Sequence, residues 1–402
     1  MRSGHADLPL HYGQVPKWLA RRMSSLGGAI VEAIIMEYGR KTLLSKMSDP
    51  CWFQSLGCVL GMDWHSSGIT TSVMGALKSA INKKSQELGI YICGGRGKHS
   101  LRTPDELLVL ANTLGLDGDT LVRHSKLTAK VDNTAIQDGF QLYLHSFILS
   151  KDGDWSVIQQ GMNTHTRMAR RYHWHSPQIK SFMEEPHSFI YGQNQGLILN
   201  LTDRQACVTK RGILTLANEH PERVLAEARK ILMPTHHDVQ EKDVNLKRLG
   251  AILSLAHAKG ITCMEDLLLL QGVGPRAIQS LTLVSEMIHG TPSRFDDPAR
   301  FSFAHGGKDG HPFPVPTKTY DETIMQLRQA LDRAKIGFTE KSEAIKNLTK
   351  IAQQRERDFV PNDHFQELVE RERATSWKYG GRTVFGKAKK HTQTISQLSL
   401  FS

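Results

Sequence analysis

The sequence predicts a mixed α/β amino-terminal half followed by an all-helical carboxy-terminal half. Three patterns indicate this: apolar residues at helical spacing before residue 90, strand-like patterns between residues 88 and 205, and renewed helical spacing after residue 206. A chain of 402 residues is long enough for two or three domains. We place an α/β domain, a helical domain, a helical extension and a flexible basic tail at residues 1–205, 206–319, 320–375 and 376–402.

The charge balance restricts the class of partner. The chain has 51 Lys and Arg against 40 Asp and Glu, a net charge of +11, which attracts polyanions. No apolar run approaches the ~18 residues of a membrane helix, and no signal peptide or basic amphipathic anchor is visible. The five cysteines form no CxxC pair, which argues against a disulfide framework or a cysteine-rich zinc site. Nucleic acid is therefore the expected partner, with no membrane, and the expected compartment is the cytoplasm, at the nucleoid.

Residues 1 to about 90 are expected to be largely helical. Apolar residues recur at helical spacing from Trp18 to Ile30. A buried-strand pattern follows at Gly89–Cys93, and Thr103 with Pro104 is expected to open a helix, with Thr103 as its N-cap. Further helices are expected at Ile252–Ala256, Met264–Leu270, Ala277–Ile288 and Ile324–Ala334.

A β-hairpin is the clearest strand signal. The strings GFQLYLHSFILS and WSVIQQG flank a turn at Lys151–Asp154, which is typical of two antiparallel strands. Because side chains alternate between the faces of a strand, the first strand has one apolar and one polar face. The apolar face carries Phe140, Leu142 and Leu144. The polar face carries Gln141, Tyr143 and His145.

Polar groups in the first half indicate hydrolysis of a phosphodiester. Carboxylates and histidines can hold Mg²⁺ or Mn²⁺, which activates water and neutralises phosphate charge, so we expect such a divalent metal without assigning its ligands. The candidate catalytic residues are Asp63, His65, Asp132, Asp138 and His145. Arg96 and Lys98, in a glycine-rich loop, are expected to steady the phosphate. The segments Tyr172–Ser176 and Glu184–His187 form a further polar group.

The segment LLLLQGVGPRAIQSLTLV resembles the helix-hairpin-helix of many DNA-repair proteins. Gly272, Val273 and Gly274 would form the turn and present backbone N–H groups at the start of the second helix, where an anion is favoured. Such a turn binds a DNA phosphate without reading sequence. Val273 would fill the hairpin core and Arg276 would add positive charge. The alternative is an ordinary turn between two helices.

The same resemblance leaves two alternatives to a nuclease open. Base-excision glycosylases with this hairpin carry a catalytic aspartate roughly two dozen residues later, and Asp296 and Asp297 follow Gly272 by 24 and 25 residues. Their bifunctional members have a lysine two residues after the second glycine. Here Arg276 stands there, and an arginine stays protonated and cannot form the Schiff base. The other alternative is a non-enzymatic DNA-binding adaptor whose polar clusters are structural.

The chain ends in a segment that resembles the peptide that docks on the bacterial sliding clamp. Its residues Gln397, Leu398, Leu400 and Phe401 lie at the tip of a tail with six Lys and Arg and no acid after Glu372. A glutamine can hydrogen-bond at a pocket mouth while apolar side chains fill a groove. The alternative is that these side chains pack on the chain's own surface. We expect the clamp to be a partner at sites of bacterial replication or repair.

Long unusual strings are spread over residues 5 to 370. They are DLPLHYGQVPKWLARRM, SDPCWFQSLGCVLGMDWHSSGITT, GIYICGGRGKHS, SKLTAKVDNTAIQDGFQLYLHSFI, QQGMN, ARRYHWHS and DPARFSFAHGGKDGHPFPV. Together they resemble the prokaryotic family called domain of unknown function seven-six-three. The resemblance implies a nuclease-like first half, related to the ParB/sulfiredoxin-type fold, and a helical DNA-binding half behind it. We therefore expect a DNA-binding, metal-dependent deoxyribonuclease of DNA repair or replication.

Overall fold

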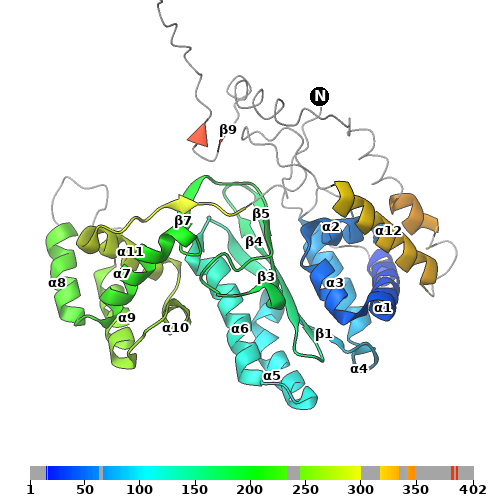
Figure 1. Ribbon diagram of the computed structural model, residues 1–402, viewed down its shortest axis with the longest axis horizontal. Coiled ribbons are helices and arrows are strands. Elements are labelled where there is room, and N and C mark those ends of the chain that lie inside the picture. The colour runs from blue at the N-terminus through cyan, green and yellow to red at the C-terminus, as the bar shows by residue number, and fades with distance from the viewer. Residues whose placement is uncertain are drawn as a thin grey trace, which may run out of the picture.

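The computed structural model describes residues 15, 17–62, 67–232, 245–299, 317–334, 340, 342–348, 382–383 and 386–387. Within these residues the architecture is mixed α/β, which confirms the predicted class at that level. A central antiparallel sheet separates two groups of helices (Figure 1).

Helices occupy the described residues before residue 89, as the apolar spacing predicts. They are α1 (Lys17–Met47), α2 (Pro50–Val59), α3 (Gly68–Ile81) and the short α4 (Ser85–Leu88). The Asp49 carboxylate caps α2 by accepting hydrogen bonds from the backbone N–H groups of Cys51 and Trp52. Helices α1 and α3 pack closely, because a Cβ on Gly28 would lie only 2.9 Å from the Ala80 Cβ.

The central sheet has five strands in the order β1-β3-β4-β5-β6. These strands are β1 (Ile90–Arg96), β3 (Gln141–Ser150), β4 (Trp155–Asn163), β5 (Met168–His175) and β6 (Phe189–Tyr191). The predicted hairpin is confirmed as β3 and β4, and the predicted strand at Gly89–Cys93 corresponds to β1. The register of β3 against β4 shifts between Leu142 and Leu144, so the predicted alternation is interrupted there.

Two helices, α5 (Thr103–Leu114) and α6 (Gly118–Lys130), follow β1. The predicted helix start is found, but Thr103 is not its N-cap. A 3₁₀ helix over Gly97–Arg102 runs directly into α5, and the Thr103 hydroxyl donates to the Ser100 carbonyl at 2.7 Å instead. A π-helical turn, Val131–Ala135, continues from α6. The second sheet joins β2 (Ile136–Gln137), β7 (Leu197–Asn200) and β8 (Phe295–Asp296).

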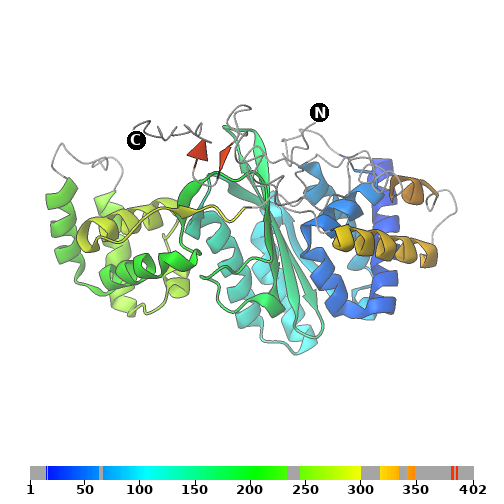
Figure 2. The same ribbon diagram turned by 45° about the horizontal axis from the view of Figure 1, so that its top comes forward.

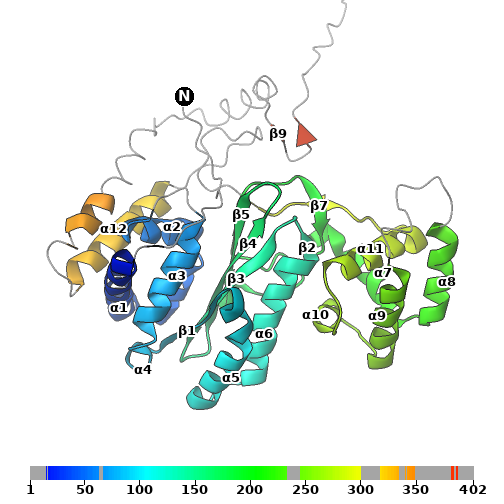
Figure 3. The same ribbon diagram turned by 180° about the vertical axis from the view of Figure 1, so that it is seen from behind.

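The carboxy-terminal part of the described chain is helical. Its elements are α7 (Cys207–Asn218), α8 (Pro221–Leu232), α9 (Leu246–Lys259), α10 (Met264–Leu269) and α11 (Pro275–His289). Seen from behind, α10 lies beside α6, with which it is in contact (Figure 3). Helix α12 (Thr317–Arg333) returns to pack on α1 and α2 (Figure 2). Tyr38 hydrogen-bonds to Gln329 across this contact.

Two hydrophobic cores lie on opposite faces of the central sheet. One packs sheet residues such as Ile92 and Ile158 against α1, α2, α3 and α12. The other packs Phe147 and Trp174 against α5 and α6 and continues through α7 to α11, so it crosses residue 205 without a break. The five cysteines are free thiols. No helix in the described ranges is long and apolar enough to cross a bilayer.

Candidate functional sites

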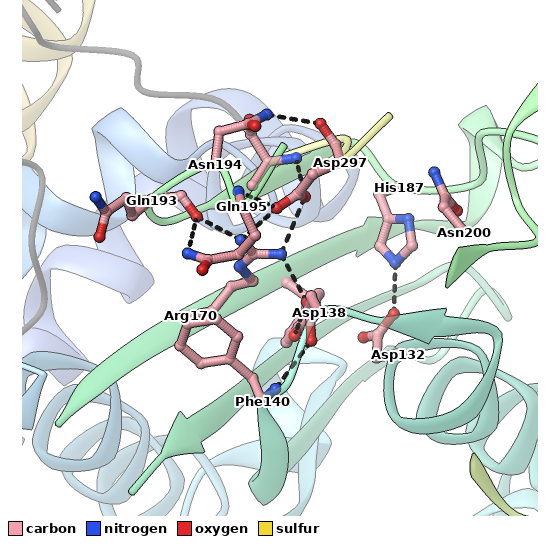
Figure 4. A network of polar contacts seen from close by, with 12 residues as sticks. Asp132, Asp138, Phe140, Arg170, His187, Gln193, Asn194, Gln195, Asn200 and Asp297 are labelled. Atoms are coloured by element: carbon pink, nitrogen blue, oxygen red, sulfur yellow. Dashed lines mark hydrogen bonds and ion pairs between the residues drawn. The ribbon is translucent and has the colours of Figure 1, made fainter. Parts of the chain in front are cut away.

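The structure describes three of the five candidate catalytic residues. Asp63 and His65 lie outside the described residues, as do Gln397, Leu398, Leu400 and Phe401 of the carboxy-terminal motif. Asp132, Asp138 and His145 are all buried. They belong to two hydrogen-bond networks, since no described residue bonds to both Asp132 and Asp138. Figure 4 shows His187 beside Asp132 and Arg170 beside Asp138.

Asp132 lies in the π-helical turn after α6, beneath the central sheet. One carboxylate oxygen, Oδ2, accepts hydrogen bonds from Gln159 Nε2 at 2.6 Å and from Trp174 Nε1 at 3.0 Å. The other, Oδ1, lies 2.5 Å from His187 Nε2. Burial raises the pKa of Asp132, while the attraction and hydrogen bond of His187 oppose that rise. Asp132 and His187 therefore form a close carboxylate–imidazole pair.

His145 extends the same network by two further contacts. Since Gln159 donates to Asp132 through Nε2, its Oε1 accepts from His145 Nδ1 at 2.9 Å. The other ring nitrogen, Nε2, then accepts from the Ser125 hydroxyl at 2.9 Å. Burial lowers the pKa of His145 to about 4, which keeps the imidazole neutral at physiological pH. A chain of hydrogen bonds thus connects Ser125 to His187.

His187 is the outermost member of this network. Its ring lies 4.2 Å from the Trp174 ring, and 6% of its side chain is exposed. The second ring nitrogen, Nδ1, makes no hydrogen bond in the described part of the chain, and Asn200 lies beside the ring (Figure 4). The sequence places His187 in a polar segment but not among the candidate catalytic residues. Its pairing with Asp132 depends on a contact between segments 55 residues apart.

Asp138 belongs to an ion cluster around Arg170 on β5. The guanidinium Nη1 donates to Asp138 at 2.7 Å and Nη2 donates to Asp297 at 2.7 Å, and the three side chains are at most 1% exposed. The Tyr172 hydroxyl also donates to Asp138, at 2.7 Å. Burial alone would lower the pKa of Arg170, but the attraction of Asp297 and Asp138 outweighs it and holds the guanidinium charged. Burial raises the pKa of Asp138.

The two aspartates of the glycosylase alternative have opposite environments. Both carboxylate oxygens of Asp297 accept hydrogen bonds. Besides the bonds from Arg170, Asp297 accepts hydrogen bonds from the backbone N–H groups of Gln195 at 2.7 Å and Ala299 at 2.9 Å. Asp296, on β8, is exposed. Asp297 therefore ties the segment after α11 to the central sheet, and Asp296 is the one open to solvent. Arg170, the partner of Asp297, could have been suspected from one feature of the sequence. It is a charged residue inside ARRYHWHS, a string that otherwise has the pattern of a strand.

The glycine turn lies between α10 and α11. Gly272 has a φ of +85°, a conformation that favours glycine, and the Val273 side chain is buried in the adjoining core at 3% exposure. Gly274 is extended, with φ −150° and ψ −174°, so its backbone does not require glycine. A Cβ on Gly274 would meet nothing nearer than Arg248 Nη2 at 4.0 Å, so the space before α11 is open.

Cations surround this open helix start. Arg248 Nη2 donates to the Gly272 carbonyl at 3.0 Å, and Lys130 Nζ donates to the Val273 carbonyl at 2.5 Å. Arg276 is exposed in the first turn of α11 and makes no ion pair with a described residue. No backbone acceptor in the described chain takes the N–H groups of Gly274 and Arg276. The start of α11 thus presents unpaired amide donors and positive charge on one surface.

Arg96 and Lys98 lie elsewhere, at the end of β1 and in the 3₁₀ helix that follows it. Arg96 ends β1, and its guanidinium lies over the Tyr143 ring at 5.9 Å. Lys98 follows in the 3₁₀ helix and is exposed. No group of three or more His, Cys, Asp or Glu among the described residues is arranged to hold a metal ion.

These features define a mixed α/β protein with a buried carboxylate–histidine network and a basic glycine turn. The family described as "Protein of unknown function (DUF763)" matches residues 4–315, which is most of the chain. The chain belongs to this family, as its long strings predicted. No curated protein matches it, and no solved structure does.

Proposed function

We propose that this protein binds DNA through backbone phosphates at the turn between α10 and α11, which would act as a helix-hairpin-helix. One observation carries the proposal: the start of α11 has open space before Gly274, unpaired amides and several cations around it. Amides and dipole at a helix start favour an anion. The net charge of +11 supports a polyanionic partner.

The contact is expected to be independent of base sequence. Backbone N–H groups and arginines that hold phosphates position a protein on DNA but carry no base-edge information. Binding should therefore be similar for unrelated sequences of equal length. This expectation separates the proposal from a sequence-reading helix in the major groove.

The experiment measures affinity of the full chain for labelled duplexes of unrelated sequence by fluorescence anisotropy. The test variant carries Gly274→Ala and Arg276→Gln, since the new methyl group blocks the open space without straining the extended backbone. The control is Arg211→Gln, an exposed cation on α7. We expect the test variant to bind every duplex about tenfold or more weakly and the control to bind as the wild type does. Equal affinity of a folded test variant would refute the hairpin as the contact.

A metal-dependent deoxyribonuclease is the second candidate, favoured by the Asp132–His187 pair. A buried carboxylate that holds one imidazole nitrogen orients the ring and leaves the other nitrogen to move a proton. His187 would act as the base in this scheme, with Asp132 as its positioning residue. Asp63 and His65 stay predicted contributors, together with Mg²⁺ or Mn²⁺. The ParB/sulfiredoxin-type comparison for the first half belongs to this candidate.

The nuclease candidate is tested with single-stranded, duplex, bubble, uracil-containing and abasic DNA, with Mn²⁺ and with chelator. Cleavage of undamaged DNA that needs metal and falls at least about a hundredfold in Asp132→Asn and His187→Ala supports it. Base release without metal that is lost in Asp296→Asn would favour the glycosylase. Tight binding with no product on any substrate would favour the adaptor recruited by the sliding clamp.

A further inference from the structure

An open pocket of about 640 Å³ lies on the other side of the central sheet from the glycine turn, between α1 and α3. Its walls come from the first turns of α1, one side of α3 and the end of β1. The volume lies within the range of small-ligand sites. None of the described candidate catalytic residues and no residue of the glycine turn lines it, but Arg96, which the sequence predicts to steady a phosphate, does.

Small side chains make this hollow. On α3 the pocket is lined, at helical spacing, by Thr71, Ser72, Gly75, Ala76, Ser79 and Ala80. Below it, Gly27 and Gly28 let α1 and α3 approach closely. The wall of the pocket therefore consists mostly of small side chains, several of them serines, together with Val15 and Met23.

The rim of the pocket carries three cations, Arg21, Lys83 and Arg96. None forms an ion pair with a described residue. Lysines just outside the pocket behave differently: Lys78 pairs with Glu106 at 2.7 Å, and Lys84 pairs with Glu32 at 2.7 Å. Carboxylates thus pair with these two lysines, whereas the three cations that line the pocket have no such partner among the described residues.

The chemistry of the lining selects the ligand. No described residue that lines the pocket is acidic, and none is aromatic. Unpaired cations with hydroxyl donors suit phosphate oxygens, whereas the lack of an aromatic ring leaves no platform on which a base could stack. We propose that this pocket binds the sugar-phosphate backbone of a nucleic-acid strand, as a second contact surface in addition to the α10–α11 turn. The inference rests on the proposed DNA binding and extends it.

A matched pair of substitutions at Gly75 tests the charge requirement. Gly75 lies in the middle of α3 with a right-handed backbone, and nothing lies within 4 Å of a Cβ built there. Both Gly75→Glu and Gly75→Gln should therefore fold, because each residue forms helix better than glycine does. The two side chains have nearly the same size and differ in charge. We expect Gly75→Glu to bind duplex DNA roughly tenfold more weakly than Gly75→Gln, and equal binding would overturn the proposal.

The salt dependence gives a second, independent readout. Removal of the three rim cations by Arg21→Gln, Lys83→Gln and Arg96→Gln should reduce the slope of log affinity against log salt by about two to three. The control triple is Lys46→Gln, Lys151→Gln and Arg211→Gln, which changes net charge equally on surfaces away from the pocket and should leave the slope unchanged. A slope that falls equally in both triples would overturn the pocket proposal.

The same assay distinguishes a nucleic-acid phosphate from a free phosphate as the ligand of the pocket. It also distinguishes failure of the pocket proposal from failure of the proposed DNA binding. Inorganic phosphate or a nucleoside triphosphate that displaces DNA at micromolar concentration would identify a small-molecule site instead and overturn the backbone assignment. If the wild-type chain binds no DNA at low salt, both proposals fail. If it binds, and only the turn variant weakens binding, the pocket proposal alone fails.

Discussion

Arg170 is the residue on which distant segments converge. It lies on β5 and bonds to Asp138, 32 residues before it, and to Asp297, 127 residues after it. Two buried carboxylates form ion pairs with one buried guanidinium. Because none of the three is solvated by water, the charged form of each is stabilised by its partners. Loss of one member leaves an uncompensated buried group.

Asp297 and Asp296 give a matched test of this cluster. Asp297→Asn should lower the free energy of unfolding by about 3–5 kcal/mol, because it breaks a fully buried ion pair. Asp296→Asn, at the exposed neighbouring position, should change it by less than about 0.5 kcal/mol. Urea unfolding followed by circular dichroism measures both. Similar stability of the two variants would contradict the assigned role of Asp297.

His145 makes a pH-dependent contribution to stability. Its folded pKa is about 4, below the ordinary value near 6.5, because burial disfavours the charged ring. Between these two pH values only the unfolded chain binds this proton. The free energy of unfolding should therefore fall as pH drops from about 6.5 to 4, by at most about 1.4 kcal/mol per pH unit from this residue.

The variant His145→Gln removes the imidazole that binds this proton, and its amide group can still hydrogen-bond to the neighbouring side chains. Its stability should decline less steeply with falling pH than that of the wild type, so the difference between the two should shrink toward pH 4. Urea midpoints at a series of pH values provide the comparison. Parallel curves over this range would show that His145 titrates alike in both states.

Among the elements, local patterns could be predicted and long-range contacts could not. The β3–β4 hairpin follows from alternation and a four-residue turn, which are properties of neighbouring residues. The predicted N-cap role of Thr103 is wrong because the 3₁₀ helix before α5 already supplies the helical turn that a cap would begin. The Asp132–His187 contact joins the π-helical turn to the segment before β6, and the Arg170–Asp297 contact joins β5 to the segment after β8. No sequence period encodes either contact.

The glycine turn makes an element-scale prediction that separates stability from binding. Gly272→Ala should cost about 1 kcal/mol of stability, because its φ of +85° strains an L-residue. Gly274→Ala should cost little, since its backbone is extended and its Cβ position is open. Both should weaken DNA binding under the proposed function. Paired unfolding and anisotropy measurements test this, and a Gly272→Ala variant as stable as the wild type would contradict the strain argument.

At the scale of the whole molecule, the central sheet separates the two proposed DNA contacts. The α10–α11 turn belongs to the core on one face, and the α1–α3 pocket lies among the helices of the other. Helix α12, which follows the family match, packs on the second group and adds the Arg333–Glu37 ion pair. A DNA strand that contacts both surfaces at once would therefore have to pass around an edge of the central sheet.

The carboxy-terminal motif predicts a second partner for the whole chain. A peptide of residues 390–402 is expected to bind purified sliding clamp with micromolar affinity, because Leu398, Leu400 and Phe401 offer about 1.5–3 kcal/mol each on burial, less the cost of ordering a tail. The control peptide has Gln397, Leu400 and Phe401 changed to Ala. Isothermal titration measures both, and no binding by the native peptide, or equal binding by both, would exclude the clamp.

The salt dependence of DNA binding is the most direct test of phosphate binding at the α10–α11 turn. The full chain and its Gly274→Ala, Arg276→Gln variant are titrated onto one duplex at several salt concentrations, with folding of each checked by thermal unfolding. We expect a linear fall of log affinity with log salt for the wild type and a slope shallower by about one to two units for the variant. No binding by the wild type at low salt, or identical slopes for two folded proteins, would contradict it.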